Sequence, residues 1–372
     1  MLDRPDTLLL GSAARKAGKT AFAVRVIRRL AARRDVVGVK LTPLPEEGDS
    51  PLPHGKSASV EAGCAGPWQI DEETSADERT DTGRMILAGA RKAFWLRARR
   101  ERLAEAAAAL WERIPAGCCI VAEGGSLRRV LKPGLFVLVR RLDVGDIQDS
   151  YRELLPLADR LDVFNGRAWD FPPEDCRFVD GAWMIRPQAS AVILAGGDSR
   201  RMGRDKALLE FEGRPLISII ASRLEELFDD IVIGANRPGD YAFLGRPVVP
   251  DREPGLGPLM GIASCLERTA EDLAFVTACD IPFLDLSFAA DMLARAEGYD
   301  MVIPRSGLDA YEPLFAVYRK TVMAPALAIL AAGGRRIVDL LGRVRAAVVP
   351  LPDSARIRNI NTIEEYLALR RG

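Results

Sequence analysis

The residue types best suited to chemistry gather in one stretch of the second half, which reads LAGGDSRRMGRDK from Leu194 to Lys206. An apolar run ends at Leu194, and the small residues after it (Ala195, Gly196, Gly197) let a backbone turn tightly and approach a ligand closely. Cationic side chains, suited to phosphate oxygens, come next: Arg200, Arg201, Arg204 and Lys206. Open α/β sheets bind ligands at such strand ends, so the pattern predicts a triphosphate site. The alternative is a tight turn with a solvated basic rim.

Polar residues also end three later apolar runs. Asn236 follows one run in GANR, Asp251 ends VVPD, and Asp280 closes TACDIP. A carboxylate that faces a triphosphate suits Mg²⁺, which typically takes one or two carboxylates plus substrate phosphates. We therefore expect Asp280 to bind Mg²⁺, with a structural cap as the alternative. Asn236 is expected to read a base edge or a ribose, although Asn236 and Asp251 also suit plain turns.

A second constellation lies near the N-terminus, where GSAARKAGKT runs from Gly11 to Thr20. Its ending, Gly18-Lys19-Thr20, is that of a P-loop, in which the lysine reaches phosphates and the hydroxyl reaches Mg²⁺. Ala13 stands where the motif has its first glycine. Further on, IVAEG places the Glu123 carboxylate at a strand end, as in a Walker B position. We expect a nucleotide site, and a plain turn between strand and helix is the alternative.

The composition limits the chemistry further. The chain has 372 residues, which suits two domains, and its 52 Lys and Arg balance its 52 Asp and Glu, so no nucleic-acid partner is expected. The one histidine, His54, excludes His-based triads and His-rich metal sites, and we expect it to be a solvated loop residue. Carboxylates, lysines, arginines, backbone amides and a hard metal ion remain for catalysis.

The sequence also bears on the cellular compartment of the protein. No apolar stretch reaches the roughly 18 residues of a membrane span, and the N-terminal residues contain no long apolar signal segment. The six cysteines show no paired spacing, so a disulfide framework is not expected, and Cys118 and Cys119 suit a core strand. We therefore predict a cytoplasmic protein with no membrane partner.

Short apolar runs alternate with helical patterns in both halves, and continuous Val, Ile and Leu favour parallel strands buried on both faces. The expected strands are Thr7–Leu10, Val36–Lys40, Cys118–Ala122, Leu135–Val139, Leu161–Asn165, Ala191–Leu194, Asp230–Gly234, Pro247–Pro250, Leu273–Thr277 and Met301–Pro304. The expected helices are Thr20–Arg34, Thr82–Ile114, Pro215–Leu227, Leu259–Arg268 and Leu286–Arg295. The pattern predicts an α/β fold of two three-layer domains in series with mainly parallel sheets, over residues 1–187 and 188–372.

Two stretches fall outside this alternation. Thr42–Pro67 is rich in Pro, Gly and Ser without periodicity, which predicts a long loop or flap. RARRER, at Arg97–Arg102, is expected on the solvated face of the alanine-rich helix Thr82–Ile114.

The motifs of the second half resemble those of the molybdenum cofactor guanylyltransferase (MobA) family. They are LAGG...RRMG.DKALL, GPLMG at Gly257–Gly261, ACDIP at Ala278–Pro282 and NINTIEEY at Asn359–Tyr366, and the resemblance covers roughly Ala191 to Arg370. It implies a Rossmann-like nucleotidyltransferase domain that uses Mg²⁺. It also implies transfer of GMP from GTP to the phosphate of molybdopterin, with release of pyrophosphate. Because the nucleophile is already an anion, no general base is needed.

The resemblance assigns roles residue by residue. The nucleotide would be lined by Leu194, Ala195, Gly196 and Gly197. Arg201 and Lys206 would hold the phosphates and, with the Mg²⁺ ligand Asp280, carry catalysis. Asp251 would lie near the ribose or guanine, and Asn359 and Asn361 near the pterin. Gly234 stands where the family often has Asn, so Asn236 is taken as the substitute for guanine recognition.

The first half resembles the molybdopterin-guanine dinucleotide biosynthesis adaptor (MobB) family and related P-loop GTPases, over roughly residues 5–170. The motifs, besides the P-loop ending, are VGVK at Val37–Lys40, DTGR at Asp81–Arg84 and IVAEG at Ile120–Gly124. The resemblance implies a P-loop NTPase-like domain that binds GTP, hydrolyses it weakly and associates with the guanylyltransferase. Lys19 and Thr20 would then touch phosphate, and Asp81 or Glu123 would support Mg²⁺. The family's His-containing segment after VGVK is absent.

Taken together, the two resemblances imply a bifunctional molybdenum-cofactor enzyme, whose protein partners would be other biosynthesis proteins or acceptor enzymes. Two alternatives stay open. One is a related nucleotidyltransferase that uses CTP or another phosphorylated acceptor, since the glycine-rich loop is shared in outline across that superfamily. The other is a nucleotide-binding cofactor carrier in which neither site turns over.

Overall fold

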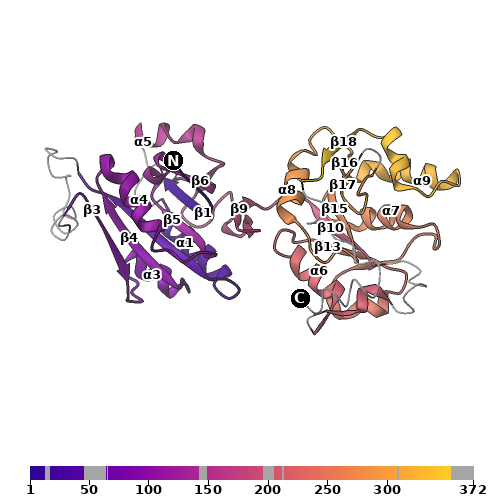
Figure 1. The fold of residues 1–372 in the computed structure, drawn as a ribbon, viewed down its shortest axis with the longest axis horizontal. Coiled ribbons are helices and arrows are strands. Elements are labelled where there is room, and N and C mark those ends of the chain that lie inside the picture. The colour runs from indigo at the N-terminus through magenta and orange to yellow at the C-terminus, as the bar shows by residue number, and fades with distance from the viewer. Residues whose placement is uncertain are drawn as a thin grey trace. The chain divides into compact units, whose positions relative to one another are not determined.

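The computed structural model describes residues 1–12, 17–45, 64, 66–141, 149–195, 205–211, 213–307 and 310–352. The chain divides into two compact units, Met1–Ile185 and Arg186–Gly372 (Figure 1). This division lies two residues before the boundary expected from sequence. Among the described residues, no helix combines the length and the apolar character needed to cross a bilayer.

The first unit is built on a seven-stranded sheet in the order β3-β4-β2-β5-β1-β6-β7. All neighbouring strands run parallel except the β3–β4 pair. The strands are β1 Leu2–Ser12, β2 Val36–Pro43, β3 Trp68–Glu73, β4 Lys92–Ala98, β5 Cys119–Glu123, β6 Leu131–Arg141 and β7 Arg160–Phe164, and a separate hairpin is formed by β8 Cys176–Val179 and β9 Ala182–Ile185. The helices are α1 Lys19–Leu30, α3 Asp81–Leu87, α4 Leu103–Trp111 and α5 Asp149–Arg152.

Two apolar layers cover this sheet, one on each face. On the central strand β1, Leu8 and Leu10 pack with α1 and α3, while Leu9 faces α4. This alternation follows from the two-residue period of a strand, and both faces are apolar because both are covered. Cys118 and Cys119 are buried in these layers, as predicted, and burial raises the pKa of the Cys119 thiol to about 12. The unit is therefore three-layered, as the sequence predicts.

The helix predicted over Thr82–Ile114 is wrong. Helix α3 ends at Leu87, Gly89 follows with φ 104°, and the chain re-enters the sheet as β4 before α4 begins at Leu103. Alanines on both sides masked the β-favouring KAFWL segment within the stretch. Arg97 is correspondingly not on a solvated helix face. It is buried on β4, with its guanidinium 4.3 Å from the Trp95 ring centroid and 2.7 Å from the Asp71 carboxylate.

The second unit has a seven-stranded sheet in the order β14-β13-β10-β15-β17-β16-β18. Strand β17 runs antiparallel to both of its neighbours, and the other pairs are parallel. The strands are β10 Ser190–Leu194, β13 Ile231–Gly234, β14 Val248–Val249, β15 Leu273–Ala278, β16 Met301–Arg305, β17 Phe315–Arg319 and β18 Ala346–Pro350, beside a hairpin of β11 Glu210–Phe211 and β12 Arg214–Pro215. The helices are α6 Leu216–Leu224, α7 Pro258–Arg268, α8 Leu286–Ala294 and α9 Met323–Ala331.

The second sheet is also covered on both faces. Helices α7 and α9 pack over Val192 and Leu194 on one face. On the other face, Phe288 of α8 stacks with Phe315, which meets Phe275 edge to face. The expected strands of this unit are all present within one or two residues, whereas β17 and β18 were not predicted.

Parallel pairing brings the strand ends of each unit to one edge of its sheet. Leu194 is in register with Gly234 on one side and with Ala278 on the other. In the first unit, Glu123 is in register with Leu10 and with Lys40. The residues that follow these positions therefore lie close together in space.

We predict that Gly134→Ala destabilises the first unit. A Cβ at Gly134 would lie 2.1 Å from the Pro5 carbonyl oxygen, a backbone atom that cannot move aside cheaply. Overpacking of this kind costs about 1–3 kcal/mol or more. Urea unfolding followed by tryptophan fluorescence isolates this unit, because all five tryptophans lie within it: Trp68, Trp95, Trp111, Trp169 and Trp183.

Gly66→Ala is the matched control. The nearest atom to its Cβ is the Trp68 carbonyl oxygen at 3.8 Å, an ordinary contact, so the unfolding midpoint should stay within experimental error. Equal midpoints for Gly134→Ala and the unmodified protein would contradict the packing described for β1 and β6.

Candidate functional site

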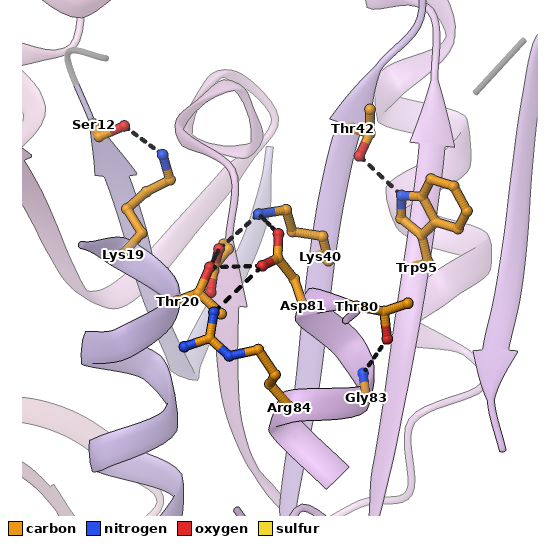
Figure 2. Close-up of polar contacts among 11 residues, drawn as sticks. Ser12, Lys19, Thr20, Lys40, Thr42, Thr80, Asp81, Gly83, Arg84 and Trp95 are labelled. Carbon is orange, nitrogen blue, oxygen red and sulfur yellow. Dashed lines mark hydrogen bonds and ion pairs between the residues drawn. The ribbon is translucent and has the colours of Figure 1, made fainter. Parts of the chain in front are cut away.

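Five polar side chains of the first unit converge at the edge where β1, β2 and β5 end (Figure 2). Their elements lie far apart in sequence, and the parallel register of β2, β5 and β1 brings them together. Lys40 projects from β2 and Glu123 ends β5, whereas the other three open helices. The group consists of Lys19, Thr20, Lys40, Asp81 and Glu123.

Lys40 is the centre of this group. Its Nζ lies 2.6 Å from Asp81 Oδ2 and 2.8 Å from Glu123 Oε2. The Thr20 hydroxyl lies 3.1 Å from Asp81 Oδ1 and 3.0 Å from Glu123 Oε2, and its single proton serves one carboxylate at a time. Two carboxylates thus share one ammonium group and one hydroxyl.

Glu123 is the most deeply placed member. Its side chain is fully buried, and its Oε1 atom has no hydrogen-bond partner among the described residues. Buried polar atoms are nearly always paired, so such an oxygen calls for an explanation such as a ligand. The site can therefore accept a further cation or donor.

The charges in the group shift one another's proton affinity. Burial acts to lower the pKa of Lys40, but Glu123 and Asp81 outweigh it and the net shift is upward. The pKa of Asp81 is lowered, because Lys40 and the Thr20 hydroxyl outweigh the opposing effect of burial. Burial lowers the pKa of Lys19, and the nearby charge of Lys40 adds to this.

The start of α1 is suited to bind an anion. Gly18 precedes the helix in the left-handed region, with φ 90° and ψ 3°, and no side chain caps the helix. Helix N-termini present unsatisfied amides to anions. A Cβ at Gly18 would approach the Phe164 ring to 2.8 Å, so glycine is required there both for φ and for space. The Lys19 ammonium contacts the Ser12 hydroxyl (Figure 2), and Ala13 lies outside the described residues.

In the second unit, Asp205 organises the turn that carries Lys206. One carboxylate oxygen accepts a hydrogen bond from the Ala207 amide at 3.0 Å. The other accepts from the Tyr241 hydroxyl at 2.6 Å, and that hydroxyl is 3.2 Å from the Ala195 carbonyl oxygen. Burial, followed by the charge and hydrogen bond of Asp205, raises the pKa of Tyr241. The Lys206 turn is thereby tied to the end of β10.

Asp280 lies across from Lys206, just after β15. Its Oδ2 is 4.0 Å from the Lys206 Nζ, and about a quarter of each side chain is exposed. Burial raises the pKa of Asp280, and Lys206 offsets part of that shift. Within the described part of the chain no group of three or more His, Cys, Asp or Glu is placed to hold a metal ion.

Asn236 and Asp251 form a reciprocal pair between the ends of β13 and β14. The Asn236 amide nitrogen donates to Asp251 Oδ2 at 2.9 Å, and the Asp251 amide donates to Asn236 Oδ1 at 2.8 Å. This pair fixes the Asp251 carboxylate beside α7, where a Cβ on Gly261 would lie 3.4 Å from Asp251 Oδ1. The geometry gives Asn236 a positioning role, and its predicted contact with a base stays a prediction.

The surroundings of Gly234 leave little room for a side chain. A Cβ there would lie 2.8 Å from both the Cys265 sulfur and a Leu194 methyl group. A larger residue at this position would collide with α7 and with the end of β10. Glycine at this position therefore agrees with the local packing.

The remaining predicted residues divide into two sets. Leu194 and Ala195 lie buried at the end of β10, beside Lys206 and Asp280 in the same unit. The others lie outside the described residues, and their roles stay predictions: Gly196, Gly197, Arg201, Asn359 and Asn361.

Sequence reasoning missed Tyr241 and the central place of Lys40. A lysine near the end of the otherwise apolar strand VVGVK was the only available signal for Lys40. Nothing in the sequence around Tyr241 marks it, because its contacts come from residues 36 and 46 positions away.

Comparisons with known proteins show which family the second unit is similar to. The family described as the MobA-like NTP transferase domain matches residues 191–346. A probable molybdenum cofactor guanylyltransferase from Pelotomaculum thermopropionicum is 41% identical over 162 residues, which span 44% of this chain and 78% of the relative. The molybdenum cofactor guanylyltransferase of Shewanella amazonensis is 36% identical over 181 residues, spanning 47% and 92% of the two chains.

A solved structure is also similar to this part of the chain. It is the molybdopterin-guanine dinucleotide biosynthesis protein A from Archaeoglobus fulgidus, with a TM-score of 0.43 and 22% identity, covering 49% of this chain and 97% of that one. The assignment itself depends on the sequence relatives, because more than two thirds of their length is matched at well over 30% identity. By its second unit, this chain belongs to the molybdenum cofactor guanylyltransferase family.

Proposed function

We propose that the second unit transfers GMP from GTP to the phosphate of molybdopterin, giving molybdopterin guanine dinucleotide and pyrophosphate. The observation that carries the proposal is the pairing of Lys206 with Asp280 at the edge where β10 and β15 end. Among relatives named for this reaction, the identity reaches 41%. The expected setting is the cytoplasm, with biosynthesis proteins or acceptor enzymes as partners.

The geometry suits an in-line displacement at the α-phosphate. An oxygen of the acceptor phosphate forms the new bond to the α-phosphorus, and the bond to the β-phosphate oxygen breaks, so pyrophosphate leaves with that electron pair. No proton has to be removed from the nucleophile. The protein's contribution is positioning and charge neutralisation, which together account for most of the catalysis in reactions of this type.

Individual residues supply these contributions. Lys206, held by Asp205, neutralises triphosphate charge, and Asp280 would hold Mg²⁺, which neutralises the phosphate oxygens when bound. Asp251, fixed by Asn236, would lie on the ribose or guanine side. From the sequence pattern, the proposed lining of the nucleotide is Leu194, Ala195, Gly196 and Gly197, the further phosphate ligand is Arg201, and the pterin contacts are Asn359 and Asn361.

We further propose that the first unit is a MobB-like adaptor domain that binds GTP. Lys19 and the amides of α1 would hold the phosphates, while Thr20 with Asp81 or Glu123 would support Mg²⁺. The buried, unpartnered Oε1 of Glu123 fits a cation site. Joining the two units in one chain raises the effective concentration of one at the other.

Asp280→Asn is expected to lower guanylyl transfer by about 100-fold or more, because it removes the carboxylate that would neutralise the metal. The measurement is pyrophosphate release from GTP in the presence of molybdopterin and Mg²⁺. Asp291→Asn, which alters an exposed carboxylate of α8, should retain full turnover. Retained activity in Asp280→Asn would remove Asp280 from the mechanism.

The same assay tests nucleotide choice. With the unmodified protein, GTP turnover should exceed CTP turnover by about tenfold or more, which corresponds to roughly 1.4 kcal/mol of discrimination. Faster turnover of CTP would identify a cytidylyl transferase instead, and binding without pyrophosphate release from either nucleotide would identify a carrier.

Lys19→Ala is expected to weaken GTP binding by the first unit about tenfold or more, because it removes a half-buried ammonium group that would donate hydrogen bonds to phosphate. Energy transfer from tryptophan to a fluorescent GTP analogue reports on this unit, since every tryptophan lies in it. The control is Lys132→Ala, an exposed lysine of β6. If Lys19→Ala and Lys132→Ala bind the analogue equally well, the first unit has no working P-loop.

A further inference from the structure

An ammonium group lies between the side chains proposed to support a metal ion in the first unit. Lys40 Nζ lies 2.6 Å from Asp81 and 2.8 Å from Glu123, and the Thr20 hydroxyl lies against the same carboxylates. Two carboxylates and a hydroxyl are hard oxygen ligands of the kind that Mg²⁺ prefers. Here they already surround a cation that belongs to the chain.

Lys40 and a metal ion would compete for Asp81 Oδ2 and Glu123 Oε2. Mg²⁺ needs ligand distances of about 2.0–2.1 Å. A metal ion at that distance from Asp81 Oδ2 and Glu123 Oε2 would lie against the Lys40 nitrogen, which bonds the same two atoms. For the metal to bind, the ammonium group has to move away.

The charge balance sets the condition for that movement. Lys19, Lys40 and Arg84, which lies 4.0 Å from Asp81 Oδ1, carry three positive charges against the two negative charges of Asp81 and Glu123, so the group is net positive without ligands. Adding a divalent cation alone would bring two like charges close to two partly buried ammonium groups. A nucleotide triphosphate reverses this balance, because its phosphates supply negative charge for both lysines.

A lysine side chain is able to make such a move. Its ammonium is a compact charge on a flexible four-carbon stem. Lys40 lies on the same sheet edge as Gly18 and Lys19, where a phosphate would bind, and part of its side chain is exposed. The unpartnered Oε1 of Glu123 offers the incoming metal one oxygen that Lys40 does not use.

We propose that Lys40 is a built-in counter-ion that occupies the metal position of the first unit and yields it only when a nucleotide phosphate binds its ammonium group. The proposal deepens the GTP-binding function and rests on it. It implies that metal and nucleotide bind to this unit together, and that metal alone is excluded.

The test is Mn²⁺ binding to the full chain without nucleotide, followed by the electron paramagnetic resonance signal of free Mn²⁺. Every protein carries Asp280→Asn, which removes the proposed metal ligand of the second unit. Lys40→Met should bind Mn²⁺ at least about tenfold more tightly than its Lys40 parent, because the competing charge is gone. Equal affinity overturns the proposal.

Three further variants serve as controls for the Mn²⁺ measurement. Lys92→Met removes another strand lysine, paired with Glu72 at 2.9 Å, and should leave Mn²⁺ affinity unchanged. Adding Glu123→Gln to Lys40→Met should abolish the gained affinity, which locates the metal. Lys40→Arg keeps the charge and should keep Mn²⁺ binding weak, so a gain in this variant counts against the proposal.

The parent protein, which keeps Lys40, provides a second measurement that does not require the Lys40→Met variant to fold. Its first unit should bind Mn²⁺ weakly alone and at least about tenfold more tightly with a non-hydrolysable GTP analogue. Tight Mn²⁺ binding without nucleotide overturns the proposal directly. If the analogue fails to bind while Lys40→Met still gains Mn²⁺, the GTP-binding function fails and the exclusion of metal by Lys40 stands.

Discussion

Parallel pairing of a central strand with neighbours on both sides is the constraint on which both sites depend. Parallel strands all end at one edge of the sheet, and their interiors are covered on both faces, so polar side chains concentrate where the strands stop. Glu123 in the first unit and Asp280 in the second are the clearest cases, since Glu123 is the last residue of the buried strand β5 and Asp280 lies two residues after the buried strand β15. A different register would separate them from their lysine partners.

Both sites combine a lysine with carboxylate side chains, but the distance between lysine and carboxylate differs between the two units. In the first unit, lysine and carboxylates are in direct contact, at 2.6 and 2.8 Å. In the second, the lysine and carboxylate stand 4.0 Å apart, and the lysine is held by an element of its own through Asp205 and Tyr241. In the first arrangement the lysine and the carboxylates bond one another directly, with only the Glu123 Oε1 atom left without a partner among the described residues, whereas the second keeps its charges apart. This contrast agrees with catalysis in the second unit and nucleotide-dependent binding in the first.

The sequence predicted those parts of the molecule that depend on local pattern. The central parallel strands were found because runs such as Ala191–Leu194 are apolar without interruption, and Asp280 was found because it comes soon after one of them. The prediction of one helix over Thr82–Ile114 failed, because the alanines on both sides of β4 give the whole stretch a helix-like composition. Tyr241 and the role of Lys40 depend on contacts between distant segments, which one sequence does not display.

Gly234 has a consequence for how this family member can change. Its missing side chain is matched to Cys265 on α7 and Leu194 on β10, so the three positions form one packing unit. A side chain at position 234 would force the ends of the Cys265 and Leu194 side chains to shift. The effects of substitutions at positions 194, 234 and 265 on the free energy of unfolding are therefore expected to be non-additive.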